Sequence, residues 1–259
     1  MSTLISPLLS RASSALWPLV PPHLLRAFCL AYLGNVFVLL SGLKRYQKPA
    51  QRMWLLSIYA SGTMTMCSLP FFVDWVSSGG NVAAIKPRPL LAETACVAFM
   101  AHLFADLSLG LVFYRSHLTL GWKWTHHACF ILVISWTLTH NLSHLFAFGG
   151  MMELPIYLIF LGFLEPALRN DTLSLVSLVA LRLVLNVVLV GQFWTPSVMA
   201  QLPGEGWERC VPALLNTAIL PGHVWIVQRM VRRVVREGRE KRAARLAERA
   251  EKVVDGAAR

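Results

Sequence analysis

Long apolar stretches separated by short polar ones dominate the sequence. Each stretch is close in length to the roughly 20 residues that a helix needs to cross a bilayer. Because there are several of them, we predict an all-α fold, a polytopic transmembrane helix bundle of about seven spans. The predicted spans run from about Leu24 to Leu43, Met53 to Val73, Leu90 to Tyr114, His126 to His144, Leu145 to Leu164, Leu173 to Trp194 and Val211 to Gln228.

The composition supports a membrane protein. Of the 259 residues, 56% are hydrophobic and 14% are charged, which is too apolar for an ordinary soluble domain. The net charge of +11 would suggest nucleic acid as a partner of a soluble chain, but here Lys and Arg concentrate in short loops and a tail. Membrane orientation explains this better, so we expect no nucleic-acid partner.

Three parts of the chain are distinguished by composition. Residues 1–23 form an N-terminal segment without the features of a removed signal peptide, and residues 24–228 form the transmembrane domain. Residues 229–259 form a basic tail, predicted to be helical because Glu237/Lys241 and Glu248/Lys252 are spaced four apart. The tail either is a solvated helix that fixes topology or contacts anionic lipid headgroups.

Positive charge indicates the orientation. The loops with Lys44 and Arg115 would share a side with the basic tail, whereas residues 197–209 carry little positive charge. Seven spans then place the C-terminus in the cytoplasm and the N-terminus outside it. Lys86 and Arg88 do not fit this distribution.

Two adjacent histidines, His126 and His127, stand where the loop containing Trp122 and Trp124 enters the fourth span. Neighbours on a helix project about 100° apart, so at least one imidazole should face the protein interior. An ionisable group inside a membrane is a functional-site hypothesis by default. The alternative is that both histidines anchor the chain at the interface beside the tryptophans.

Other polar residues interrupt the spans. His102 and Asp106 stand four apart and could hydrogen-bond each other, and Arg182 and Asn186 have the same spacing. If the polar faces turn inward, these groups line a cavity that suits an amphiphile. The expected substrate-binding residues are His102, Asp106, Glu153, Arg182, Asn186 and His223. The alternative is that the carboxylates and the arginine form a buried ion-pair network that specifies helix packing.

The chain from about residue 50 to 235 resembles the TLC family (TRAM, Lag1 and CLN8 homology). The resemblance rests on Ala105-Asp106-Leu107, His126-His127, Met152-Glu153-Leu154-Pro155, and Leu181-Arg182-Leu183 with Asn186, in that order. It implies a role in lipid metabolism, involving sphingolipids and ceramide, in the endoplasmic reticulum. In the ceramide synthases the paired histidines belong to a longer signature with downstream aspartates. Here that second half is missing, so the chain looks closer to the CLN8-like, non-synthase branches.

Two functions follow from these residues. The first is a protein that binds, senses or distributes membrane lipids without chemistry. The second is a ceramide-synthase-like, acyl-CoA-dependent N-acyltransferase, in which His126 or His127 is the catalytic base or nucleophile and Asp106 or Glu153 orients the imidazole. Whether the chain is an enzyme stays open at this point.

A third class, a lipid oxidase with two metals, is weaker. His126-His127 and the pair His140 and His144 would stand at opposite ends of one helix, roughly 20 Å apart, which is too far for shared metal ions. We expect no metal site and no cofactor, with acyl-CoA as a co-substrate only for an acyltransferase. The expected partners are membrane lipids, and a homodimer is an open alternative.

Overall fold

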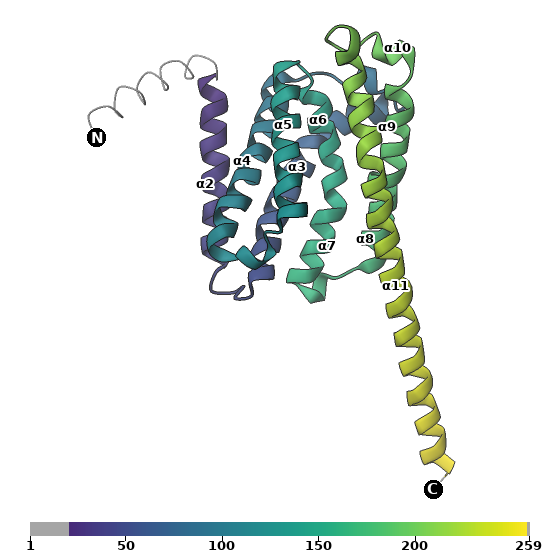
Figure 1. Cartoon of the computed structure of the whole chain (residues 1–259). Helices are drawn as coiled ribbons and strands as arrows, with labels where there is room; N and C mark the ends of the chain where they lie inside the picture. The colour runs from purple at the N-terminus through teal and green to yellow at the C-terminus, as the bar shows by residue number, and fades with distance from the viewer. Residues whose placement is uncertain (1–20, 258–259) are drawn as a thin grey trace, which may run out of the picture. The chain divides into compact units, whose positions relative to one another are not determined.

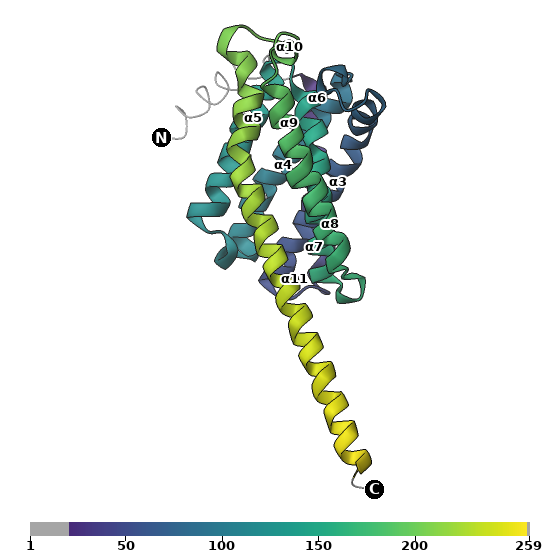
Figure 2. The same ribbon diagram turned by 90° about the vertical axis from the view of Figure 1, so that its right-hand side faces the viewer.

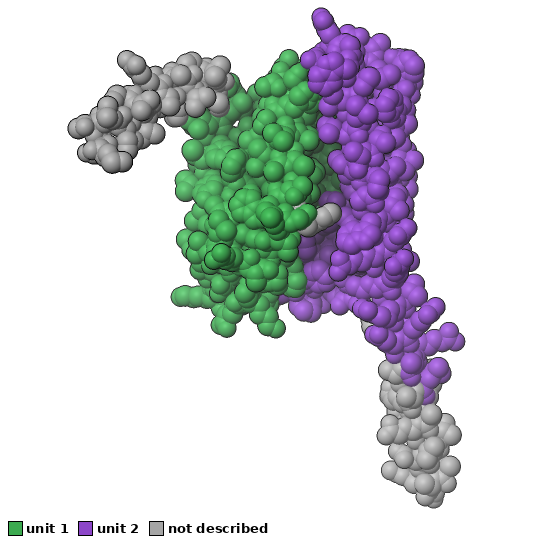
Figure 3. Space-filling view, viewed as in Figure 1, with its two compact units in different colours: residues 1–153 green, residues 154–259 purple. Residues whose placement is uncertain are grey.

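The computed structural model describes residues 21–257, which form helices joined by short turns (Figure 1). No β-strand occurs in this part of the chain, so the predicted all-α fold is confirmed. The chain divides into two compact units, Met1–Glu153 and Leu154–Arg259 (Figure 3), and the division falls inside the predicted transmembrane domain. Most of the predicted N-terminal segment, residues 1–20, lies outside the described residues.

Unit 1 is built around α4. Its α-helices are α2 (Pro22–Gly42), α3 (Pro49–Ser77), α4 (Pro89–Phe113), α5 (Thr125–Thr139) and α6 (Ser143–Gly149). Short helices of other types are η2 (Val82–Ala84), η3 (Arg115–His117), η4 (Leu120–Trp124) and η5 (Gly150–Glu153). Helix α4 packs against α2, α3, α5 and α6. The first three helices each begin with a proline, whose fixed φ and missing N–H suit the first helical position.

Unit 2 contains one very long helix. Its elements are α7 (Leu154–Leu164), the 3-10 helix η6 (Pro166–Leu168), α8 (Asp171–Ser177), the π-helix η7 (Leu178–Val184), α9 (Leu185–Phe193), α10 (Pro196–Met199), the 3-10 helix η8 (Gly206–Cys210) and α11 (Val211–Ala257). Helix α11 has 47 residues and joins the last predicted span to the basic tail without a break (Figure 2). It packs on α8, η7 and α9, and its buried Val227 and Met230 meet Leu178.

Six continuous helical segments within residues 21–257 are long and apolar enough to cross a membrane. They are Pro22–Gly42, Pro49–Ser77, Pro89–Phe113, Ser143–Leu164, Asp171–Phe193 and Gly206–Glu240. The predicted polytopic membrane bundle is thus confirmed. The remaining predicted span corresponds to α5, which has 15 residues and is too short on its own to cross.

The boundary predicted between the fourth and fifth spans is wrong. Helix α5 ends at Thr139, and His144 already belongs to α6. The cause is Asn141, whose φ of 57° is left-handed, a conformation that ends helices and that Asn tolerates better than most residues. The N–H of Leu142 then reaches back to the carbonyl of Thr137 at 2.9 Å, the six-to-one bond of a Schellman motif.

The close approach of η5 to α3 depends on a glycine. A Cβ on Gly150 would lie 2.9 Å from the backbone oxygen of Met64, whereas a Cβ on the neighbouring Gly149 would meet nothing within 4 Å. We therefore expect Gly150→Ala to lower the free energy of unfolding by about 1–3 kcal/mol through overpacking. Gly149→Ala, the matched control, should be neutral or stabilise by up to about 1 kcal/mol.

Thermal unfolding of the purified protein in detergent measures both changes. Equal transition temperatures for the two variants would show that the helices do not approach each other this closely.

Candidate functional site

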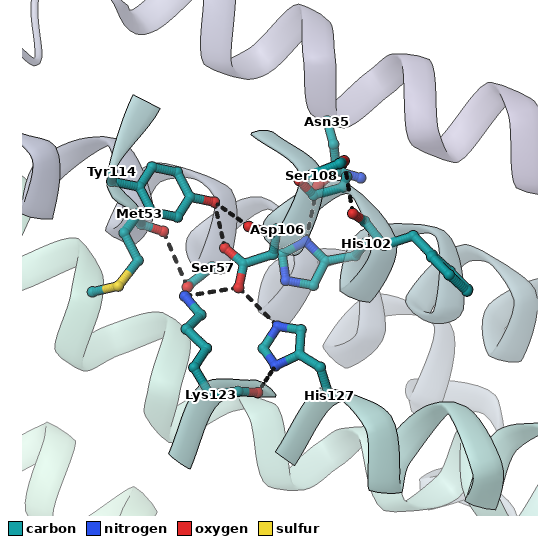
Figure 4. Close-up of polar contacts among 11 residues, drawn as sticks. Asn35, Met53, Ser57, His102, Asp106, Ser108, Tyr114, Lys123 and His127 are labelled. Carbon is teal, nitrogen blue, oxygen red and sulfur yellow. Dashed lines mark hydrogen bonds and ion pairs between the residues drawn. The ribbon is translucent and has the colours of Figure 1, made fainter. Parts of the chain in front are cut away.

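A buried carboxylate is the centre of the candidate site in unit 1. Asp106 of α4 is 1% exposed, and three side chains reach its two oxygens (Figure 4). The Tyr114 hydroxyl donates to Oδ1 at 2.5 Å, and Oδ2 lies 2.7 Å from Lys123 Nζ and 2.8 Å from His127 Nε2. We call these four residues the Asp106 network.

Local structure brings the network together. Tyr114 directly follows the last residue of α4, so its side chain folds back along its own helix, and the hydroxyl also lies 3.0 Å from the Asp106 carbonyl oxygen. Lys123 lies in η4 (Leu120–Trp124), a π-helix that leads into α5, one turn before His127. The Lys123 ammonium also stands 5.4 Å from the centre of the Tyr114 ring.

Three donors, from Tyr114, Lys123 and His127, surround the Asp106 carboxylate. Burial first, and then the nearby Asp106 carboxylate, raise the pKa of Tyr114 above its usual range, so its hydroxyl stays protonated and donates. Lys123 supplies a positive charge next to the same carboxylate. Charge-assisted hydrogen bonds of this kind offset the desolvation that burying an anion costs.

Both ring nitrogens of His127 are engaged. Nε2 faces the Asp106 carboxylate, and Nδ1 lies 2.8 Å from the backbone oxygen of Lys123. Because a carbonyl oxygen can only accept, Nδ1 carries a proton, and a proton also lies between Nε2 and the carboxylate. In this arrangement the ring has no lone pair to offer to a substrate.

The two adjacent histidines therefore have different surroundings. His127 is 5% exposed and faces the interior, which confirms the prediction that at least one imidazole points inward. His126 is exposed, and its ring lies 4.6 Å from the ring of Phe130 and 5.6 Å from that of His127.

His102 and Asp106, whose spacing allows a hydrogen bond between them, take other partners. Helix α4 packs on α2 and on α5, and each side chain takes its partner from a different neighbour. His102 Nδ1 lies 2.8 Å from the Asn35 side-chain oxygen of α2, whereas Asp106 bonds to His127 of α5. Spacing of four along a helix allows a contact, but it does not decide between two packed neighbours.

The hydrogen bonds of Asn35 fix the tautomer of His102. The Asn35 amide nitrogen donates to the Ala31 carbonyl oxygen at 2.8 Å, so the atom facing the imidazole is the amide oxygen, an acceptor. His102 Nδ1 must then be the donor, and in the neutral ring Nε2 is an acceptor.

His102 and Asn35 also line a small cavity of about 50 Å³, which we call the α2–α4 crevice. Its lining residues are Ala31, Asn35, Tyr59, Ala60, Thr63, Met64, Ala98, Phe99 and His102. Asn35, Thr63 and His102 lie within about 5 Å of the midpoints of their helices along the helix axes. The crevice thus offers hydrogen-bonding groups halfway along three helices that are able to span a membrane.

The other predicted site residues have other partners. Glu153, at the end of η5, accepts a hydrogen bond from Ser61 of α3 at 3.0 Å. Arg182, Asn186 and His223 belong to unit 2. The structure therefore describes Asp106 and His127 as one cluster, and it describes the three residues of unit 2 separately.

Within unit 2, Asn186 is 0% exposed and donates to the Asn216 side-chain oxygen at 3.3 Å. His223 is 6% exposed and lies beside Arg182 of the π-helix η7. In the described part of the chain, Asn186 Oδ1 and His223 Nδ1 have no hydrogen-bond partner. Buried polar atoms of this kind mark a place where a water molecule or a ligand group fits.

Sequence reasoning missed four residues that these clusters depend on: Asn35, Tyr114, Lys123 and Asn216. Two of these residues could have been found from the sequence. Asn35 and Asn216 are isolated amides within apolar spans, and such groups need a partner in a membrane. Tyr114 and Lys123 read as ordinary residues of the interface between span and loop.

Comparison with protein-family models, with curated proteins and with solved structures gave no match. Among the described residues, no three His, Cys, Asp or Glu side chains are placed so that they could hold a metal ion together.

The Asp106 network predicts a large and non-additive effect of substitution. Asp106→Asn leaves Lys123 and His127 facing a neutral amide, and breaking a buried ion pair in this way should lower the free energy of unfolding by about 3–5 kcal/mol. Lys123→Met in the Asp106→Asn background should restore part of that stability, because the unpaired cation is then also removed.

Unfolding of the single and double variants in detergent measures this coupling. Tyr114→Phe serves as a milder comparison, with an expected loss of about 1.5–3 kcal/mol from one hydrogen bond to a charged group. Strictly additive effects of Asp106→Asn and Lys123→Met would contradict the network.

Proposed function

We propose that this chain is a TLC-type multi-pass membrane protein that binds membrane lipids in order to sense or distribute them, with sphingolipids such as ceramide as the first candidates. The proposal combines the ordered motifs of the sequence with six helices that are able to span a membrane. The endoplasmic reticulum and a cytoplasmic C-terminus complete the proposal; the first follows from the family resemblance and the second from the charge distribution.

The observation that carries the proposal is the engagement of both His127 nitrogens. An N-acyltransferase needs an imidazole that can accept a proton from the attacking amine. His127 instead holds Asp106 with one nitrogen and the Lys123 carbonyl with the other. This arrangement suits a structural and electrostatic role better than general-base catalysis.

The α2–α4 crevice supports a binding role. Nε2 of His102 is an acceptor, and two residues that carry hydroxyl groups, Tyr59 and Thr63, belong to the same lining. A ceramide carries an amide N–H and hydroxyl groups, and these are donors of the kind that such an acceptor needs. A volume of about 50 Å³ admits one small polar group while the chains of the lipid lie outside.

A second candidate function is the ceramide-synthase-like N-acyltransferase. The pairing of Asp106 with His127 at 2.8 Å favours it, because a carboxylate that orients an imidazole is a common part of acid–base sites. Since His127 is engaged at both nitrogens, the exposed His126 would be the group that meets the amine, with acyl-CoA as the co-substrate.

One reconstituted system tests both functions. The full chain in liposomes is exposed to a photoactivatable ceramide, and separately to labelled acyl-CoA with a sphingoid base. We expect cross-linking to the wild type and no amide product. Ala98→Leu, which narrows the crevice, should reduce cross-linking by about tenfold, the effect of roughly 1.4 kcal/mol in binding. Leu111→Phe on the exposed part of α4 is the matched control and should leave cross-linking unchanged.

The outcomes separate the candidates. Amide product that disappears in His126→Gln would establish the acyltransferase and overturn the non-enzymatic function. Cross-linking that is unaffected by Ala98→Leu would place lipid binding somewhere other than the crevice.

A further inference from the structure

A row of arginines follows one face of α11. Arg229, Arg232, Arg236 and Arg239 are all exposed, and their spacing of three and four residues places them along one stripe of the helix. Trp225, which is 50% exposed, stands at the inner end of the same stripe, and the Arg229 guanidinium lies 5.4 Å from the centre of its ring. We call these five residues the arginine stripe.

Ion pairs inside unit 2 fix the level of the stripe relative to the membrane. Asp171 is the first residue of the span Asp171–Phe193, and Arg233 of α11 bonds to it at 2.7 Å. Arg169, just before this span, bonds to both Asp171 and Glu237. Residues 229–236 of α11 therefore lie at the level where α8 begins, which is the membrane face of that span.

Trp225 is consistent with this level. It lies two turns inside Arg233 on the same helix, at the depth where tryptophans form the interfacial belt of membrane proteins. Val231 and Val235, which are 40% and 47% exposed, lie on one side of the stripe and present apolar surface there. A helix surface of this kind suits the boundary between acyl chains and headgroups.

Acidic residues do not neutralise the stripe. Glu237 is turned toward Arg169 and Arg233, away from the stripe. Glu240 pairs with Arg236 at 3.8 Å, and both side chains are about 70% exposed, at 67% and 71%. The charged face thus carries four arginines against one glutamate at its outer end, and guanidinium groups match the geometry of phosphate oxygens.

We propose that the arginine stripe binds the phosphate-bearing headgroups of anionic phospholipids in the membrane leaflet that α11 leaves. The stripe needs only the membrane setting of α11, so this proposal is independent of lipid binding in the α2–α4 crevice. According to this proposal, one face of α11 binds the leaflet, and the positive charge of the tail as a whole does not account for the binding.

Native mass spectrometry of the full chain, mixed with micelles of phosphatidylserine or phosphatidylcholine, tests the proposal. The wild type should retain more phosphatidylserine than phosphatidylcholine. Replacing all four arginines of the stripe by glutamine should reduce the retained phosphatidylserine by at least about tenfold, since each cation near an anionic surface contributes on the order of 1 kcal/mol.

A control of equal charge comes from the same helix. Glutamine at Lys241, Arg242, Arg245 and Arg249 removes four charges farther along α11 and should change retention less than about twofold, because these residues lie beyond the membrane face. Glu240→Gln should increase retention, since it frees Arg236 from its pair. Ala98→Leu should leave retention unchanged.

Three results would overturn the proposal. The two quadruple variants could lose phosphatidylserine equally, which would show a general charge effect. Glu240→Gln could leave retention unchanged, or short RNA could displace the lipid from the wild type, which would show a surface for any polyanion. All variants are first compared with the wild type by thermal unfolding, so that a loss of fold is recognised.

Discussion

A carboxylate buried among membrane-capable helices is the constraint on which unit 1 depends. Asp106 is 1% exposed, and an isolated anion in such a place would cost several kcal/mol of folding free energy. Three segments supply donors to this carboxylate: Tyr114 at the end of α4, Lys123 in the π-helix before α5 and His127 in the first turn of α5. The carboxylate thereby fixes where α5 begins and how it lies against α4.

The same constraint bears on function. A histidine next to an aspartate looks like part of a catalytic dyad, but its chemistry depends on the second ring nitrogen. In His127 that nitrogen is bonded to the backbone of η4, so the imidazole links η4 to Asp106 of α4. His102 differs from His127. Asn35 orients its ring through Nδ1, and Nε2 remains an acceptor. His102 also lines the α2–α4 crevice.

The apolar pattern predicted the fold well because span length is set by bilayer thickness, a constraint that acts on each segment by itself. The inward orientation of one of the paired histidines followed from helix geometry in the same way. The hydrogen-bond partners of the polar side chains could not be predicted from the sequence in this way. The His102 contact depended on Asn35 of α2, which is 67 residues away in the sequence, and the end of α5 depended on the conformation of Asn141. Sequence spacing indicates which side chains share a face, but packing decides which neighbour that face meets.

The continuity of α11 fixes the position of His223 relative to the start of α8. His223, with its unpartnered ring nitrogen, and the arginines near the membrane face belong to one rod, and no proline follows Pro221 to act as a hinge between them. Arg233, which α11 pairs with Asp171 at the start of α8, is ten residues from His223, so this ion pair also sets the level of the imidazole at about 15 Å along the helix axis from the start of α8.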